Sequence, residues 1–456
     1  MNLADLLAWT RETPADCLVI LAFGTVWFSL YYVDQFRRWG TLSIGAWFLG
    51  FDFFLKIVVM YPFAKSPENV IDVARSLSAV QAHVDEALRI SAVGVVSMMA
   101  GMLVSGQRGD AGGFRVLDRL HGTLLRCWAT RNGAVAASGL AFGSMLLLMV
   151  LGFKPFIARD LVFDRPELRP AFNLWYEIVP FSTLCVAAYA LRVSSSHALA
   201  GSLAIALVSV LGGNRTVVIF SLVHVCIMWS MPARRKSILV PLAVAASLAT
   251  LALAISVLRG DEAHKVGAGG LNRLLYGSNL SDLRDFAWML SGLHDQFYGG
   301  LTYLAGYLAF IPTFLLSFRY DMAIGRVSAL LAGLDPSRHS GLRPPLFGEL
   351  YVNFAIPGVV IGGAGFGWVL GRILRWVDHA LANTSAQAGY CAPVVVWSGL
   401  IAYQVATSLI FTSGFFGVYV ICALIAVGLL LERLGWSADS SVHASRPGDE
   451  AMTRKA

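Results

Sequence analysis

Residues 134–153 read AVAASGLAFGSMLLLMVLGF, twenty consecutive residues without a charged side chain. A helix of this length rises about 30 Å, which matches the hydrocarbon core of a bilayer. Because lipid offers the backbone no hydrogen-bond partners, a segment that crosses it forms a helix. This stretch therefore predicts a transmembrane α-helix.

The composition extends this interpretation to all 456 residues. Hydrophobic residues make up 57 % and charged residues 14 %, against about 25 % charged in an average soluble domain. The mean hydropathy is +0.65. These values exclude a soluble enzyme, a nucleic-acid-binding domain and a disordered scaffold, and the net charge of +7 is interpreted as a sign of loop orientation. The sequence predicts an all-α polytopic membrane protein.

The sequence contains eleven apolar runs long enough to cross a membrane. For a twelfth apolar stretch, 301–318, a crossing is ambiguous. The eleven runs are 16–33, 41–61, 89–106, 134–153, 174–192, 198–212, 216–231, 237–258, 355–374, 393–411 and 415–432.

Lysines and arginines gather in 34–40, 107–133, 232–236, 372–390 and the C-terminal tail. Basic loops stay on the cytoplasmic side of a membrane. We therefore expect an outer N-terminus and a cytoplasmic C-terminus. These basic segments all lie on one side if the N-terminus is outside and 301–318 does not cross the membrane, so we expect 301–318 to be re-entrant or interfacial.

The predicted organisation has four parts. They are an N-terminal bundle of about eight helices (1–258), a long outer catalytic loop (259–354), C-terminal transmembrane helices (355–432) and a cytoplasmic tail (433–456). Connections as long as 259–354 are usually functional. Its apolar stretches, 286–291 and 301–318, are expected to be helices that lie against the bilayer or re-enter it.

The first candidate site is the break Gly212-Gly213-Asn214-Arg215 between two short spans. Two glycines permit a tight turn and close approach of a ligand. Arg215 is expected at a helix N-terminus, where backbone N–H groups and the guanidinium both favour an anion. The alternative is a tight hairpin whose arginine reaches the lipid headgroups.

The second candidate site is a set of four arginines of the long loop. Arginine binds phosphate through a planar fork and keeps its charge. An anionic lipid ligand is the functional interpretation, and an ordinary solvated loop is the alternative. The four are Arg259, Arg284, Arg319 and Arg343.

The third candidate site is Glu349 with Asn353, spaced i, i+4 before a predicted span. On a helix the two side chains share one face. A partly desolvated carboxylate there can accept a proton from a hydroxyl nucleophile. The alternative is a carboxylate that stabilises the start of the helix.

Asp52 and Lys56 lie i, i+4 inside the second predicted span. Ionisable groups inside a membrane are costly and often functional. The simplest interpretation is an internal ion pair that fixes helix packing, and transport is the alternative.

No phosphate-loop, HExxH or GxSxG motif is present, and the six cysteines are isolated, without CxxC spacing. We expect no metal and no cofactor. No predicted cytoplasmic region is large enough to bind a nucleotide sugar. An enzyme with this sequence is expected to use a substrate that is carried on a lipid or lies at the outer face.

The chain resembles the O-antigen or oligosaccharide repeat-unit polymerases of bacterial surface-polysaccharide assembly. The resemblance covers mainly residues 205–375. It depends on the Gly-Gly-Asn-Arg turn, the long loop, Phe310-Ile311-Pro312, and Glu349-Leu350-Tyr351-Val352-Asn353-Phe354 before Pro357-Gly358. The family pattern has a basic residue after Phe-Ile-Pro, where this chain has Thr313. Either Arg319 takes over that role or the subsite differs in this chain.

The resemblance implies a periplasmic-face glycosyltransferase of the bacterial inner membrane, which joins repeat units carried on undecaprenyl pyrophosphate. The lipid pyrophosphate leaves, and a hydroxyl of the next unit attacks. It further implies a chain-length regulator and a flippase as partners, and no nucleic acid. The roles assigned are pyrophosphate binding for Arg215, Arg259, Arg284, Arg319 and Arg343, a base at Glu349 (with His339 or Asp285 as alternatives), and support from Gly212, Gly213, Asn214 and Asn353.

Three other functions remain open. An O-antigen ligase shares the spans and the loop, and the Glu349–Asn353 motif only modestly favours a polymerase. A lipid-linked oligosaccharide flippase or another transporter needs a lined cavity and two similar halves, and the sequence shows no such halves. A non-catalytic assembly partner does not need clustered arginines.

Overall fold

The computed structural model describes residues 15–39, 43–65, 77–107, 114–153, 168–211, 215–233, 280–294, 296–336, 341–384 and 392–434. These residues are helical almost throughout and include no strand. The protein is therefore an all-α polytopic membrane protein. The predicted span 237–258 lies outside the described residues, as does the tail from 435 onward.

The helices before the long loop follow one another from α2 to α12. They are α2 (Ala15–Trp39), α3 (Ile44–Trp47), the π-helix η1 (Phe48–Val59), α4 (Tyr61–Lys65), α5 (Leu77–Ala82), α6 (Val84–Gln107), α7 (Arg115–Thr123), the π-helix η2 (Leu124–Trp128), α8 (Arg131–Val150), α10 (Arg169–Arg192), α11 (Ser196–Leu211) and α12 (Arg215–Ala233).

The remaining helices belong to the long loop and to the C-terminal part. They are α15 (Asp282–Leu290), α16 (Leu301–Tyr307), α17 (Ser317–Asp321), α18 (Ile324–Leu331), α19 (Gly348–Thr384), α20 (Ala392–Ile410), the 3₁₀ turn η4 (Thr412–Gly414) and α21 (Phe415–Arg433). We call the described residues 280–347 the inter-span segment.

Seven helical segments of the described residues are long and apolar enough to cross a membrane, and each coincides with a predicted span. They are Ile44–Lys65, Val80–Ser105, Arg131–Val150, Pro170–Arg192, Gly348–Ala382, Ala392–Ile410 and Thr412–Arg433. Two further predicted spans correspond to shorter apolar helices, Ser196–Val208 and Val218–Pro232. The first predicted span, 16–33, lies within α2. Orientation across the membrane stays a prediction.

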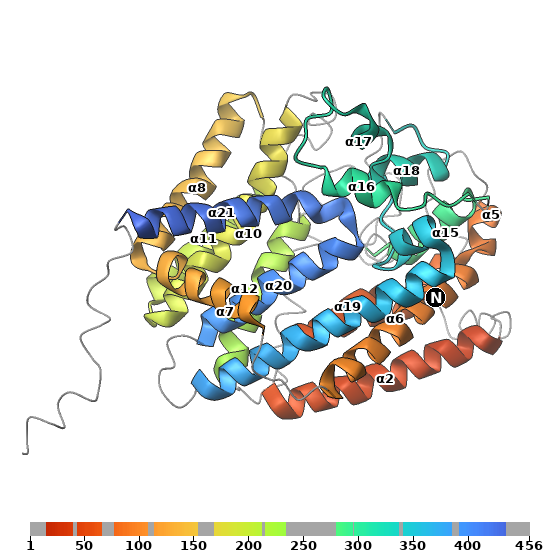
Figure 1. The fold of residues 1–456 in the computed structure, drawn as a ribbon, viewed down its shortest axis with the longest axis horizontal. Helices are drawn as coiled ribbons and strands as arrows, with labels where there is room; N and C mark the ends of the chain where they lie inside the picture. Colours follow the sequence, from red (N-terminus) through yellow and green to blue (C-terminus); the bar gives the residue numbers. More distant parts are fainter. Residues whose placement is uncertain are drawn as a thin grey trace, which may run out of the picture.

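Among the described helices, α19 and α6 share the most extensive contact, and α2 runs beside them (Figure 1). Small residues let the two backbones approach. A Cβ added at Gly101 of α6 would collide with the carbonyl oxygen of Ala364, and one at Gly367 of α19 with that of Met98. In lipid no hydrophobic force drives helices together, so they associate through close van der Waals packing of this kind.

Helix α19 breaks near its start, at Ala355. This residue has φ 54° and ψ −155°, a conformation that costs a non-glycine residue energy. Pro357 explains the break, because its ring excludes the carbonyl of Asn353 from the helical ladder. The carbonyls of Val352 and Asn353 accept hydrogen bonds from Tyr298 N (3.1 Å) and Gly299 N (2.9 Å) instead. The break therefore joins α19 to the inter-span segment.

We expect Ala355→Gly to raise the free energy of unfolding by about 1 kcal/mol, since glycine adopts this conformation without strain. Unfolding by SDS in mixed micelles measures the change. Ala364→Gly, a helical position of α19, is the matched control and is expected to lower stability by about 0.5–1 kcal/mol. Equal losses in the two variants would contradict strain at Ala355.

The inter-span segment gathers four short helices, α15 to α18, at one end of the bundle (Figure 1). Helix α15 packs on α5, α6 and η1, and Phe286, Ala287 and Met289 are fully buried. The expectation that 286–291 lies against the bilayer is therefore wrong, because protein helices enclose this stretch.

The stretch 301–318 is not one helix. Helix α16 occupies only Leu301–Tyr307, about 10 Å, which is too short to cross a bilayer. Tyr303 and Tyr307 donate hydrogen bonds to the carbonyls of Ile410 (2.6 Å) and Leu409 (2.7 Å). These carbonyls end α20 and lack helical partners, so α16 caps that helix.

Candidate functional site

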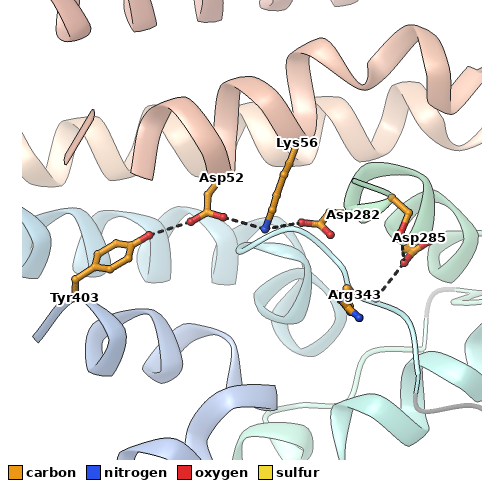
Figure 2. Close-up of polar contacts among 7 residues, drawn as sticks. Asp52, Lys56, Asp282, Asp285, Arg343 and Tyr403 are labelled. Carbon is orange, nitrogen blue, oxygen red and sulfur yellow. Dashed lines mark hydrogen bonds and ion pairs between the residues drawn. The ribbon is translucent and has the colours of Figure 1, made fainter. Parts of the chain in front are cut away.

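A chain of charged and polar side chains connects the bundle to the inter-span segment (Figure 2). The ammonium of Lys56 lies 3.0 Å from a carboxylate oxygen of Asp52 and 3.0 Å from one of Asp282. The hydroxyl of Tyr403 donates a hydrogen bond to Asp52 at 2.9 Å. The chain therefore runs from α20 through the π-helix η1 to the first residue of α15. The predicted pair Asp52–Lys56 is confirmed, and it has two additional partners.

The backbone of η1 sets this geometry. Asp52 and Lys56 lie four residues apart in a π-helix, a conformation that is rare and often occurs at functional sites. Phe48, Phe53 and Ile57 of the same element are buried in the hydrophobic core. The apolar residues thereby hold η1 in place, while Lys56 contacts Asp282 of α15 and Asp52 contacts Tyr403 of α20.

Asp282 is the acidic residue of the inter-span segment that contacts Lys56 of the bundle. Burial raises the pKa of its carboxyl, and the nearby charges of Lys56 and Arg343 oppose that rise. Asp282 occupies the first turn of α15, where the helix dipole also favours a negative charge. The acid is thus stabilised by Lys56 on one side and by the more exposed Arg343 on the other.

Asp285 lies one turn further along α15 and is buried. Its carboxylate accepts hydrogen bonds from the Ser281 hydroxyl (2.9 Å), from the Arg284 guanidinium (3.2 Å) and from the backbone N–H of Arg343 (3.4 Å). Three sequence-predicted site residues, Arg284, Asp285 and Arg343, therefore come together. The residue Arg343 is exposed to solvent, whereas Arg284 is 7 % exposed.

Glu349 and Asn353 lie on one face of α19, as their spacing predicts. The amide of Asn353 donates to the carbonyl of Glu349 (2.9 Å) and to the hydroxyl of Thr302 (2.7 Å), and its oxygen accepts from Gly300 N (3.0 Å). The carboxylate of Glu349 accepts from the Thr302 hydroxyl and from the hydroxyl and N–H of Thr412, each at 2.7 Å. Both side chains are buried and join α16, α19 and η4.

The other predicted residues are dispersed or not described. The guanidinium of Arg319, in α17, is partly buried and donates a hydrogen bond to the carbonyl of Ile311. Helix α12 begins at Arg215, where the sequence predicts a helix start. Gly212, Gly213, Asn214, Arg259 and His339 lie outside the described residues, as does the side chain of Arg215.

Two members of the charged chain, Asp282 and Tyr403, are absent from the sequence-based site. Tyr403 lies 351 positions from its partner Asp52, so no local pattern connects them. Asp282 carried a usable signal, because Ser281-Asp282 precedes an apolar run and is typical of a helix start. Its contact with Lys56 still required the tertiary structure.

The cluster as a whole has three carboxylates, three cations and one tyrosine. Lys56 and Arg284 are occupied by carboxylates, so Arg343 has the cation best placed to meet a soluble or lipid-borne anion. Within the described residues, no three His, Cys, Asp or Glu side chains are grouped to hold a metal ion. No family model, curated protein or solved structure matches the chain.

Proposed function

We propose that this membrane protein is a glycosyltransferase that joins oligosaccharide units carried on a polyprenyl pyrophosphate, at the outer face of a bacterial inner membrane. The observation that carries the proposal is the position of Arg343. Arg343 is an exposed residue whose backbone N–H donates to Asp285, the partner of Arg284, and whose charge acts on Asp282, where the inter-span segment meets the spans. The resemblance to repeat-unit polymerases adds the substrate class.

The proposed reaction needs stabilisation of a leaving group. Pyrophosphate departs well from a sugar when its developing negative charge meets fixed cations. A guanidinium supplies two parallel hydrogen bonds to phosphate oxygens and keeps its charge at every relevant pH. In the proposal Arg343 makes this contact, and the buried Arg284 of α15 contributes a second positive charge to the site. Arg215, Arg259 and Arg319 complete the proposed phosphate-binding set.

A bacterial strain from which the gene for this protein is deleted tests the proposed function. Surface polysaccharide is separated on a gel, and lipid-linked intermediates are analysed in parallel. A polymerase predicts that single units still reach the surface while the ladder of longer chains is lost. Long polymer left on the lipid carrier would instead mean a ligase.

A transporter is the second candidate function, and a specific observation favours it. Asp52 and Lys56 place charge inside a candidate membrane span, a feature that transporters share. Unpolymerised units trapped on the cytoplasmic leaflet of the deletion strain would establish a flippase and reject the polymerase.

We expect Arg343→Ala to lower polymer formation about 10²-fold, as is typical when one donor to a developing oxyanion is removed. The gel ladder measures polymer, and immunoblotting of membranes measures insertion. Arg326→Ala is the matched control, because Arg326 belongs to the same segment but stacks on Tyr320 (4.4 Å to the ring centroid) and is expected to leave the ladder unchanged. A normal ladder in the Arg343 variant would remove Arg343 from the site.

A further inference from the structure

A histidine and a glutamate form a close pair where α5 ends and α6 begins. His83 Nδ1 lies 2.9 Å from Glu86 Oε2. The side chains are 37 % and 44 % exposed, so both are partly open to solvent. An ionised carboxylate only accepts hydrogen bonds, so it holds the imidazole proton on Nδ1. In the neutral imidazole the other ring nitrogen, Nε2, is then a proton acceptor, which is the arrangement of a carboxylate-oriented general base.

This pair borders the proposed site. The hydroxyl of Tyr351 donates to Glu86 Oε1 at 3.3 Å, and Tyr351 belongs to the same turn of α19 as Glu349. The Tyr351 ring packs edge-on against Phe286 of α15, with centroids 6.1 Å apart. Phe286 directly follows Asp285 in the chain, and α15 packs on both α5 and α6. One aromatic side chain therefore connects the pair to the helix that carries Arg284 and Asp285.

The two carboxylates proposed from the sequence are less suited to accept a proton. Glu349 and Asp285 are both buried, and each already accepts three hydrogen bonds. Asp85, the acidic neighbour of Glu86, is bound by Lys65 at 2.8 Å and by the Tyr61 hydroxyl. Around the start of α6, His83 combines partial exposure with a nitrogen that can accept a proton.

We propose that His83, oriented by Glu86, is the general base of the polymerisation reaction, an inference that rests on the proposed function. The acceptor sugar hydroxyl gives its proton to His83 Nε2, and its oxygen forms a bond to the anomeric carbon of the donor. The bond from that carbon to the pyrophosphate oxygen breaks, and its electron pair leaves with the lipid pyrophosphate. The imidazolium returns the proton to solvent, so that atoms and charges balance.

The alternative is a structural pair, because residues i and i+3 at a helix start often bond for local stability. Chemical rescue separates the two roles. Free imidazole can replace a missing catalytic imidazole in the space that glycine leaves, whereas it cannot replace a lost helix-end contact. His83→Gly is therefore the decisive variant, and Glu86→Gln tests the orienting carboxylate.

The assay mixes purified full-length protein with membranes of the deletion strain, which hold the native lipid-linked units. His83→Gly is expected to lower the rate of chain growth about 10²-fold or more, the usual contribution of general base catalysis. Added imidazole is expected to raise the rate of the His83→Gly variant at least about tenfold. His294→Gly, an exposed histidine of the inter-span segment, is the matched control and is expected to behave as wild type with or without imidazole.

Several outcomes would overturn the assignment. One is a His83→Gly rate close to wild type. Another is a folded His83→Gly protein, by size-exclusion profile, whose lost activity imidazole does not restore. If His83→Gly does not fold, His83→Gln is measured in its place, and normal activity of that variant rejects the base. Wild-type protein that fails to extend the units would instead reject the proposed function itself.

Discussion

Lys56→Met is expected to lower the free energy of unfolding by about 3 kcal/mol, near the lower end for loss of one partner in a buried ion pair. Methionine keeps the length of the side chain but leaves Asp52 and Asp282 without the cation that both contact at 3.0 Å. The two carboxylates are 23 % and 13 % exposed, so water screens them only partly. Unfolding by SDS in mixed micelles measures the loss, and the polymer ladder is expected to fall with it.

A double-mutant cycle separates the charge effect from lost packing. Asp282→Asn alone leaves Lys56 paired with Asp52, and the double variant leaves Asp52 with the Tyr403 hydroxyl. The double variant is therefore expected to be more stable than Lys56→Met by about 1 kcal/mol, within the coupling range of contacting residues. If the losses in free energy of unfolding of Lys56→Met and Asp282→Asn add up to the loss of the double variant, the contact between Lys56 and Asp282 does not stabilise the packing of α15 on the bundle.

The spans were predictable because a long uncharged run is a local property of sequence. Residues 134–153 and 393–411 coincide with α8 and α20 to within a few residues. The burial of 286–291 was not predictable in this way, because an apolar stretch has the same composition whether lipid or protein covers it. Only the packing of α15 on α5 and α6 distinguishes the two.

In the candidate site, too, contacts between residues close in sequence were predictable and contacts between distant residues were not. Helical spacing correctly places Glu349 and Asn353 on one face, and the i, i+4 spacing correctly pairs Asp52 with Lys56. The contacts of Lys56 with Asp282 and of Glu86 with Tyr351 cross more than 200 positions of sequence. No periodic pattern reports such contacts, so their residues emerge only from the three-dimensional arrangement.

Glu349→Ala is expected to cause the largest loss of stability of the variants considered, about 3–5 kcal/mol. The change removes the acceptor for three donors, the hydroxyls of Thr302 and Thr412 and the buried N–H of Thr412. Each buried donor left without a partner costs about 1–3 kcal/mol. Since these donors belong to α16 and η4, the inter-span segment is expected to detach from the start of α19. SDS unfolding and the yield of folded protein in membranes measure the effect.

Glu349→Gln separates this structural role from a base at the same position. The amide keeps the shape of the side chain but turns an NH₂ group toward Thr302 or Thr412, so we expect partial loss of stability with polymer in proportion to folded protein. Asp321→Ala is the matched carboxylate control, since Asp321 is 53 % exposed and lies 3.7 Å from Arg326, a surface pair worth about 0–1 kcal/mol. A Glu349→Gln protein with wild-type stability and no polymer would instead make Glu349 the base, and would then take that role from His83.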